Sequence, residues 1–152
     1  ILEMCNSSNP LTQNIGLRLR ADEYGATTGR PRRIAWGDAV AIEYGVGVNG
    51  PLKLILTKAD CLSGLKEFKV AFRYRSSDKR MLSFFPRDPE VLNSVTPVYA
   101  VYGGYEMACG ESNYDKLPGS LRLAIGELEQ RVRAPVIAVS TGPDQKDMAY
   151  RN

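Results

Sequence analysis

The sequence predicts an α/β domain in which a mixed sheet is flanked by helices, and three observations lead to this expectation. The predicted segments follow one another as helix, strand, hairpin, helix and strand, an order typical of α/β domains. Two of the strands are short apolar runs of the kind that is buried inside a sheet. The chain has 152 residues, 43% of them hydrophobic, which suits one domain with a buried core.

The first third of the chain carries little periodic pattern. Residues 1–14 are polar and unpatterned, and Asn9-Pro10 is a turn signal, so we predict no regular element there. A short amphipathic stretch follows, in which apolar residues stand among arginines: Ile15, Leu17 and Leu19. Residues 25–33 form a loop rich in Gly, Thr, Pro and Arg.

The next pair of elements is a helix and a buried strand. Residues 36–48 predict a helix, with Val40 and Tyr44 four apart on one face. Asn49-Gly50-Pro51 should end it, because glycine suits the left-handed position after a helix and proline prevents continuation. The apolar run 52–57 then predicts a buried strand.

A β-hairpin is expected in the middle of the chain. Residues 67–75 alternate cleanly between the two faces of a strand, with one face formed by Phe68, Val70, Phe72 and Tyr74. Residues 76–79 suit a turn into a second strand at 81–85. Residues 86–113 are rich in Pro, Gly and Tyr and predict loops with one strand near 98–101.

The last two elements are the clearest helix and another buried strand. Residues 118–133 carry an apolar stripe of Leu121, Ile125, Leu128 and Val132. On the opposite side we expect Glu127–Arg131 and Glu129–Arg133 to pair four residues apart. Residues 135–140 predict a buried strand, which ends at Thr141-Gly142-Pro143-Asp144.

Composition excludes several classes of protein. A net charge of +3, from 20 basic and 17 acidic residues, is too weak to indicate nucleic-acid binding by itself. No apolar run reaches about 18 residues, so no membrane span is predicted. The three cysteines, Cys5, Cys61 and Cys109, contain no Cys-x-x-Cys pair and predict neither a zinc ribbon nor a disulfide framework; we interpret them as the thiols of a cytosolic protein. The chain also lacks histidine and a Gly-x-x-x-x-Gly-Lys-[Ser/Thr] phosphate loop.

The first candidate binding segment is the loop 25–33, Gly-Ala-Thr-Thr-Gly-Arg-Pro-Arg-Arg. Pro31 favours an extended backbone at Arg30, so Arg30 and Arg32 should point the same way and Arg33 the other. Two convergent guanidinium groups suit a carboxylate or a phosphate. A solvated basic loop and a nucleic-acid contact are the alternatives.

Two further candidate segments follow the predicted buried strands. Asp60, in Thr57-Lys58-Ala59-Asp60, could accept hydrogen bonds from the N1–H and exocyclic amine of guanine, while the Lys58 stem covers the ring. The alternative is a turn with a solvated lysine and a capping aspartate. Backbone groups of residues 140–144, Ser-Thr-Gly-Pro-Asp, could meet a purine carbonyl, or they form a simple Gly-Pro turn.

In order and context, these three segments resemble adenylosuccinate synthetase over roughly residues 13–148. The loop 25–33 and the Trp and Asp-Ala-Val after it look like that family's aspartate-binding loop. Leu-Thr-Lys-Ala-Asp before Leu62-Ser-Gly-Leu is similar to its guanine motif, and Val139-Ser-Thr-Gly-Pro-Asp to its closing signature. Departures are Ala59 where leucine is expected, Gly103-Gly104-Tyr105 where Pro-Gly-Trp is more usual, and a poor match over 106–115.

The resemblance implies a function and a set of site residues. The family joins IMP and L-aspartate to adenylosuccinate in AMP biosynthesis; GTP, with Mg²⁺, phosphorylates the IMP 6-oxygen, which the aspartate amine then displaces. Substrate binding is implied for Ala26, Thr27, Thr28, Gly29, Arg30, Pro31 and Arg32, with Arg30 also reaching the IMP ribose. GTP binding is implied for Arg32, Lys58, Ala59, Asp60, Ser140, Thr141 and Gly142.

The resemblance also implies what this chain lacks. Residues 1–152 would be the C-terminal portion of a cytoplasmic, homodimeric ligase, whose phosphate loop, catalytic residues and magnesium ligands lie in an N-terminal part. We therefore expect a binding portion that is inactive alone, with no catalytic or metal-binding residue and no nucleic-acid or membrane partner. The alternative is a non-catalytic basic α/β module for RNA or a partner protein, which a phosphate loop encoded upstream would exclude.

Overall fold

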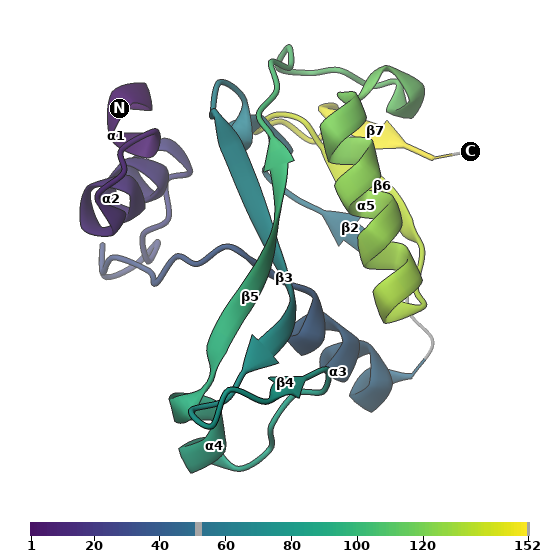
Figure 1. Cartoon of the computed structure of the whole chain (residues 1–152). Helices are drawn as coiled ribbons and strands as arrows, with labels where there is room; N and C mark the ends of the chain where they lie inside the picture. Colours follow the sequence, from purple (N-terminus) through teal and green to yellow (C-terminus); the bar gives the residue numbers. More distant parts are fainter. Residues whose placement is uncertain (51–52, 152) are drawn as a thin grey trace.

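The computed structural model describes residues 1–50 and 53–151, and it confirms the mixed α/β class (Figure 1). Two sheets are present rather than the one expected, and each contains both parallel and antiparallel pairs. The helices are α1 Leu2–Cys5, α2 Pro10–Arg20, α3 Ala39–Asn49, α4 Pro89–Ser94 and α5 Gly119–Val132, with 3-10 turns η1 Ala59–Leu62 and η2 Tyr114–Lys116. The strands are β1 Gly37–Asp38, β2 Leu54–Leu56, β3 Glu67–Arg75, β4 Met81–Leu82, β5 Thr96–Gly103, β6 Val136–Ser140 and β7 Met148–Tyr150.

The first sheet is organised around β3, whose bounds are those predicted from the alternating pattern. The strand β5 pairs antiparallel along the whole of β3, from Glu67↔Gly103 to Arg75↔Thr96. The other edge of β3 is shared by β1, which runs parallel, and by β4, which runs antiparallel. The long β3–β5 ribbon crosses the middle of the molecule in Figure 1.

The second sheet has the order β2-β6-β7, with β2 and β6 parallel. Helix α5 lies over this sheet in Figure 1, and its stripe residues Leu121, Ile125 and Val132 are buried, as predicted. Phe68 of β3 stacks on Tyr102 of β5 at a centroid distance of 5.1 Å. These aromatic rings join Val136 and Val139 in one core cluster, so both sheets share a hydrophobic core.

The prediction of no regular element in residues 1–14 was wrong. Asn9 accepts hydrogen bonds from the backbone N–H groups of Leu11 and Thr12, and Pro10 occupies the first turn, so the turn signal is the start of α2. A Cβ on Gly16 would lie 2.7 Å from the backbone N of Cys5. Close packing of α2 on α1 therefore supports a helix that starts before the amphipathic stretch at Ile15, Leu17 and Leu19.

Several predicted boundaries also need correction. Helix α3 begins at Ala39 rather than at residue 36, because the Asp38 side chain accepts from the N–H groups of Val40 and Ala41. The helix ends at Asn49, one residue later than predicted, and Gly50 follows it with a positive φ of +86° but a ψ of −166°, which is not the left-handed helical conformation expected. Pro51 and Leu52 lie outside the described residues, and β2 is described from Leu54.

The segment predicted as loops with one strand near 98–101 holds the main partner of β3, so that strand is confirmed and extends over Thr96–Gly103. Residues 86–113 contain α4 and the eight-residue strand β5, whereas the expected hairpin strand shrinks to the two residues of β4. Asp88 caps α4, and Pro89 stands in its first turn. Strand β7 was not predicted, because three residues are too few to show a period.

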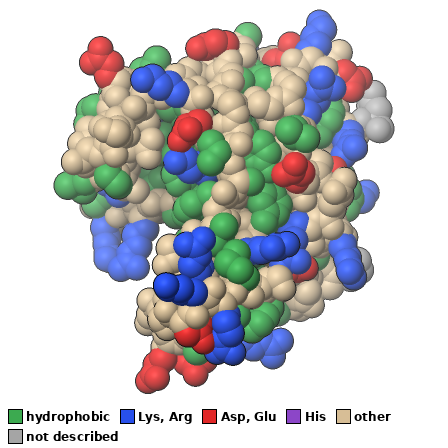
Figure 2. All heavy atoms as spheres, in the orientation of Figure 1, with side chains coloured by type: hydrophobic (Ala, Val, Ile, Leu, Met, Phe, Trp, Pro, Cys, Tyr) green, Lys and Arg blue, Asp and Glu red, His purple; other side chains and the backbone are tan. Residues whose placement is uncertain are grey.

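Figure 2 shows acidic and basic side chains interspersed over one face of the molecule, with a group of Lys and Arg side chains projecting from the left-hand lobe. In Figure 1 that position is occupied by the loop 25–33. Within the residues that the structure describes, no helix has the length and apolar character needed to cross a membrane.

Candidate functional site

The parallel pairing of β2 and β6 brings the second and third candidate segments to one edge of the sheet. Leu56 pairs with Val139, so Thr57 and Ser140 leave the sheet on neighbouring strands. The carboxyl ends of adjacent parallel strands are where ligands collect in open α/β sheets. The structure therefore assembles two segments that lie about 80 residues apart in the chain.

The first candidate segment is a tight, exposed turn beside this edge. The Gly25 N–H donates to the Arg30 carbonyl at 2.9 Å, and the Gly29 N–H donates to the Gly25 carbonyl at 2.8 Å. Gly29 has φ +63°, a conformation that favours glycine. Residues 26–33 are all exposed. Convergence of Arg30 and Arg32 on one ligand stays a prediction.

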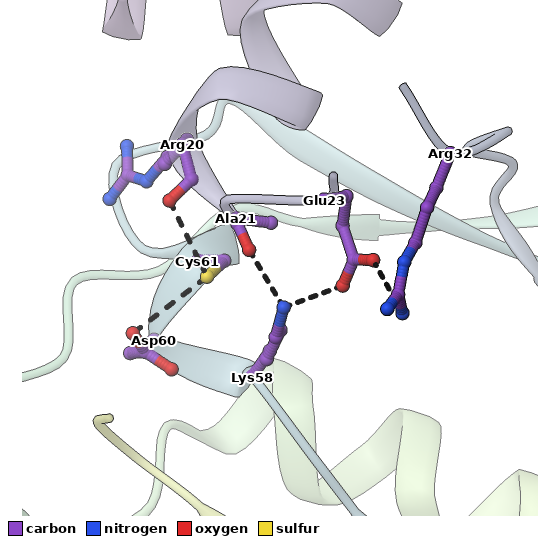
Figure 3. A network of polar contacts seen from close by, with 7 residues as sticks. All are labelled: Arg20, Ala21, Glu23, Arg32, Lys58, Asp60 and Cys61. Atoms are coloured by element: carbon purple, nitrogen blue, oxygen red, sulfur yellow. Dashed lines mark hydrogen bonds and ion pairs between the residues drawn. The ribbon is translucent and has the colours of Figure 1, made fainter. Parts of the chain in front are cut away.

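Glu23 connects the first and second segments (Figure 3). Its Oε1 lies 2.6 Å from Lys58 Nζ, and its Oε2 lies 3.5 Å from Arg32 Nη1. Lys58 Nζ also donates to the Ala21 carbonyl at 2.7 Å. The hydrogen bond from Lys58, aided by the positive charges of Lys58 and Arg32, lowers the pKa of the Glu23 carboxyl. The carboxylate is thus held ionised between two predicted ligand-binding cations.

Lys58 has an unusual backbone for a residue with a side chain. Its φ of 60° and ψ of 33° are left-handed, which costs roughly 1–3 kcal/mol. This conformation ends β2 sharply and starts η1, with Ala59 buried and Asp60 half-buried directly after it. Strain of this kind persists only where surrounding contacts hold it, and the Lys58 bonds to Glu23 and Ala21 are such contacts.

Asp60 and its neighbour Cys61 lie at the start of η1. Cys61 Sγ is 3.8 Å from Asp60 Oδ2, and burial, together with the charge of Asp60, raises the pKa of the Cys61 thiol to about 11. A thiol is a weak donor, so the Asp60 carboxylate can still accept strong N–H donors. From the other side, the Tyr105 hydroxyl donates to the Ala59 carbonyl at 2.7 Å and steadies the turn.

The third segment is held by hydrogen bonds of its own buried residues. Thr141 is fully buried; its N–H and its hydroxyl donate to the Asp147 carbonyl at 2.9 and 3.2 Å, and the hydroxyl also lies 2.9 Å from the Glu111 carbonyl. The Ser140 hydroxyl donates to the Gly142 carbonyl at 3.0 Å. A Cβ on Gly142 would lie 2.5 Å from Asp147 Oδ2 and 2.7 Å from Cys109 Sγ, so these side chains would have to move to admit one. Thr141 therefore positions the turn, and its contact with GTP stays a prediction.

A cavity of about 340 Å³ opens beside the Glu23 network. Its lining includes Glu23, Arg33, Trp36, Lys58 and Cys61, so it has an aromatic wall and a charged rim. A larger cavity of about 670 Å³ lies away from the three segments, and its Arg151 is paired with Glu129 at 2.6 Å. We place the candidate site at the smaller cavity, because Lys58, one of the predicted binding residues, lines it together with Glu23, whose carboxylate also contacts Arg32.

Sequence reasoning missed the residues that hold the site together: Glu23, Tyr105 and Asp147. Glu23 stands two residues before the glycine loop, and an acid beside a basic loop was the available signal. Tyr105 follows Gly104, where a Cβ would lie 1.6 Å from the Leu65 carbonyl oxygen, so the close approach needs glycine. Of the described residues, no group of three His, Cys, Asp or Glu could hold a metal ion.

Comparison with known proteins identifies a family for this chain. The family model of adenylosuccinate synthetase matches residues 6–149. Adenylosuccinate synthetase of Stenotrophomonas maltophilia is 41% identical over 131 residues, which cover 86% of this chain and 30% of the relative. That of Halothermothrix orenii is 40% identical over 144 residues, which cover 93% of this chain and 33% of the relative.

A solved structure gives the same result for the fold. The structure of fully ligated adenylosuccinate synthetase from Plasmodium falciparum has a TM-score of 0.85 and 29% sequence identity, and the match covers 96% of this chain and 35% of that one. The chain thus spans about a third of the length of the relatives that it matches. From the family model, the sequence identities and the shared fold, this chain belongs to the adenylosuccinate synthetase family.

Proposed function

We propose that this chain supplies the aspartate-binding and guanine-binding segments of an enzyme that uses GTP to join IMP and L-aspartate into adenylosuccinate. It would correspond to the C-terminal third of that ligase. One observation supports the proposal: the parallel strands β2 and β6 lead side by side into the second and third segments, and Glu23 links Lys58 of the second segment to Arg32 of the first. Membership of the family supports the reaction class.

The chain's own residues act by binding and orienting. Arg32, with Thr27 and Thr28, would donate to the substrate carboxylates, and these residues lie in the exposed turn of the first segment. Arg30 would reach the IMP ribose from the same turn. Charge-assisted bonds of this kind would hold the aspartate amine in place for attack on the activated purine.

Guanine recognition would come from the other two segments. Asp60 would accept from the base N1–H and exocyclic amine, and the Lys58 stem would cover one ring face. Backbone groups of Ser140 and Gly142 would meet the opposite edge, at the end of the neighbouring strand. The hydrogen bond from the Tyr105 hydroxyl to the Ala59 carbonyl would hold the backbone next to Asp60 in place.

Magnesium, a homodimer and a cytoplasmic location belong to the proposal as well, along with the absence of nucleic-acid and membrane partners. Within the described ranges, the acidic and cysteine side chains form no group that could hold a metal ion. Glu23 is already paired with Lys58 and Arg32. The proposal therefore assigns no magnesium ligand in this chain.

The test is the activity of the complete gene product that contains this chain. It should form adenylosuccinate from IMP, L-aspartate and GTP with Mg²⁺, and omission of any one of these should stop the reaction. A gene product that forms none and instead binds RNA with a steep salt dependence would replace the proposal with a basic binding module.

A further inference from the structure

The Glu23 network joins two binding segments that the proposed function assigns to different ligands. Arg32 belongs to the segment proposed for aspartate, and Lys58 belongs to the segment proposed for guanine. Each takes a different oxygen of the same carboxylate, as Figure 3 shows. We infer that Glu23 is a positioning residue that couples the two ligands, because its carboxylate responds to a ligand at Arg32 by holding Lys58 more firmly.

The two bonds to Glu23 are unequal, and this gives the coupling its direction. The Lys58 bond is short, at 2.6 Å, whereas the Arg32 contact is 3.5 Å long. The Arg32 side chain is 60% exposed, against 48% for Lys58 and 24% for Glu23. An anionic ligand can therefore draw Arg32 away from Glu23 at little cost.

Losing Arg32 changes the charge balance at Glu23. With both cations present, the single negative charge of Glu23 is shared between them. Once a ligand carboxylate occupies Arg32, Lys58 is the remaining ion-pair partner of Glu23 in the network. Its ammonium is then held more strongly beside the Ala21 carbonyl, in the position from which its stem would cover guanine. Because coupling between two binding sites is reciprocal, a nucleotide bound at Lys58 should raise the affinity for aspartate by the same factor as aspartate raises the affinity for the nucleotide.

The effect should be modest, because the pairs are partly exposed. Ion pairs of this type change an equilibrium by about 2- to 5-fold. Backbone bonds hold the same region, including the Arg32 N–H to the Glu23 carbonyl at 3.0 Å. Removing the Glu23 charge should therefore remove the coupling without unfolding the loop.

The first test needs no ligand. Acetic anhydride acylates only the uncharged lysine amine, so the rate at Lys58, followed by peptide mass spectrometry, reports how firmly its ammonium is held. In the complete gene product, Arg32→Leu should slow acylation of Lys58 by about 2- to 5-fold. In a Glu23→Gln background the same substitution should leave the rate nearly unchanged. Lys69, which pairs with Glu67 at 2.8 Å, is the internal control and should react alike in all variants.

Two results would overturn the inference at this stage. An equal slowing in both backgrounds would mean that Arg32 acts directly through its charge rather than through Glu23. A Lys58 rate that ignores Arg32→Leu altogether would mean that the two cations are independent.

The second test uses ligands and rests on the proposed function. Dissociation constants of a non-hydrolysable GTP analogue are measured with and without L-aspartate. In the parent protein, aspartate should lower the dissociation constant of the analogue by about 2- to 5-fold. In Glu23→Gln the dissociation constants with and without aspartate should be about equal, at an unchanged melting temperature. Asp78→Asn, which breaks the Arg80 ion pair at the far end of β3, is the matched control. In this variant aspartate should lower the dissociation constant of the analogue as much as in the parent.

The outcomes separate the two ideas. A gene product that binds neither ligand would overturn the proposed function, and the acylation rates would still decide the role of Glu23. A Glu23→Gln variant that retains the parent's coupling factor would overturn the inference even if the enzyme is active.

Discussion

At the residue scale, the site depends on charged groups whose partners come from distant parts of the chain. Lys58 bonds to Ala21 and Glu23, which lie 37 and 35 residues earlier. Arg32 bonds to Glu23 within its own loop. Burial is slight at this rim, so these residues serve binding more than stability, and substitutions should change ligand affinity before they change folding.

Arg32 should govern the affinity for aspartate. Arg32→Leu in the complete gene product should raise the KM for aspartate by about 10- to 100-fold and the KM for IMP far less, because charge-assisted hydrogen bonds contribute roughly 1.5–3 kcal/mol. Arg80→Leu removes another exposed, ion-paired arginine, 79% exposed against 60% for Arg32, from the β3–β4 turn and serves as the control. An unchanged aspartate KM in Arg32→Leu would remove the loop from the aspartate site.

Asp60 should select guanine over other bases. Asp60→Asn puts an NH₂ donor opposite the guanine amine, and an unpaired buried group costs about 1–3 kcal/mol, more where charge is involved. Loss of GTP use should therefore reach roughly 10- to 100-fold or more, while XTP, with an oxygen at that position, should be used better.

The measurement is kcat/KM for GTP and XTP in Asp60→Asn and in the parent. Asp78→Asn is the matched control and should leave the ratio of the two nucleotides unchanged. If Asp60→Asn also leaves it unchanged, Asp60 is a turn residue and the guanine pocket lies elsewhere.

At the element scale, the turn after β5 supports the nucleotide segment. Gly104 lies against the backbone of Leu65 and Lys66, and Tyr105 directly after it reaches the Ala59 carbonyl. Burial raises the pKa of the Tyr105 phenol, with a contribution from the charge of Asp60, so the hydroxyl stays a donor at neutral pH. The position of η1 thus depends on a segment more than 40 residues later.

Gly104→Ala should therefore be far more disruptive than an ordinary glycine substitution. Its Cβ would lie 1.6 Å from the Leu65 carbonyl oxygen, so the backbone must move, and we expect a loss of about 3 kcal/mol or more. In contrast, a Cβ at Gly45 inside α3 meets no described atom within 4 Å, so Gly45→Ala should stabilise the protein by about 0.5–1 kcal/mol. The measurement is the midpoint of urea unfolding for each variant. Equal midpoints for Gly104→Ala and Gly45→Ala would contradict the packing at Gly104.

At the scale of the whole molecule, the chain contains binding segments but neither a histidine nor a phosphate loop. We expect the 152-residue chain alone to show no synthetase activity with GTP, IMP, L-aspartate and Mg²⁺, because the groups for phosphoryl transfer are missing from its sequence. Turnover by the purified chain, above that of an Asp60→Asn control, would contradict this. The assay is the appearance of adenylosuccinate.

The fold class, the strand β3 and the helix α5 could be predicted because their patterns are local. Alternation along residues 67–75 and the stripe from Leu121 to Val132 are readable within a few residues. The three candidate segments were recognised as motifs for the same reason. Two of them follow strands, as predicted, but only β6 is mostly buried, whereas Ile55 of β2 is 55% exposed. Helices α1 and α2 were missed because their packing depends on Gly16 rather than on an apolar period.

The sequence alone predicted the strand β3, the helix α5 and three candidate segments, whereas only the tertiary structure decided the partners. Strand β3 pairs along its length with β5, and the hairpin strand expected after it pairs only with its last two residues, Tyr74 and Arg75. The expected pairs on α5 are replaced by long-range ones: Tyr102 bonds to Glu127, Arg151 to Glu129, and Arg131 to Glu43. A pair four residues apart on a helix contributes only about 0.2–0.5 kcal/mol, so a better-placed distant group prevails. Glu23 bridges two loops for the same reason, since folding brings Lys58 to it across 35 residues.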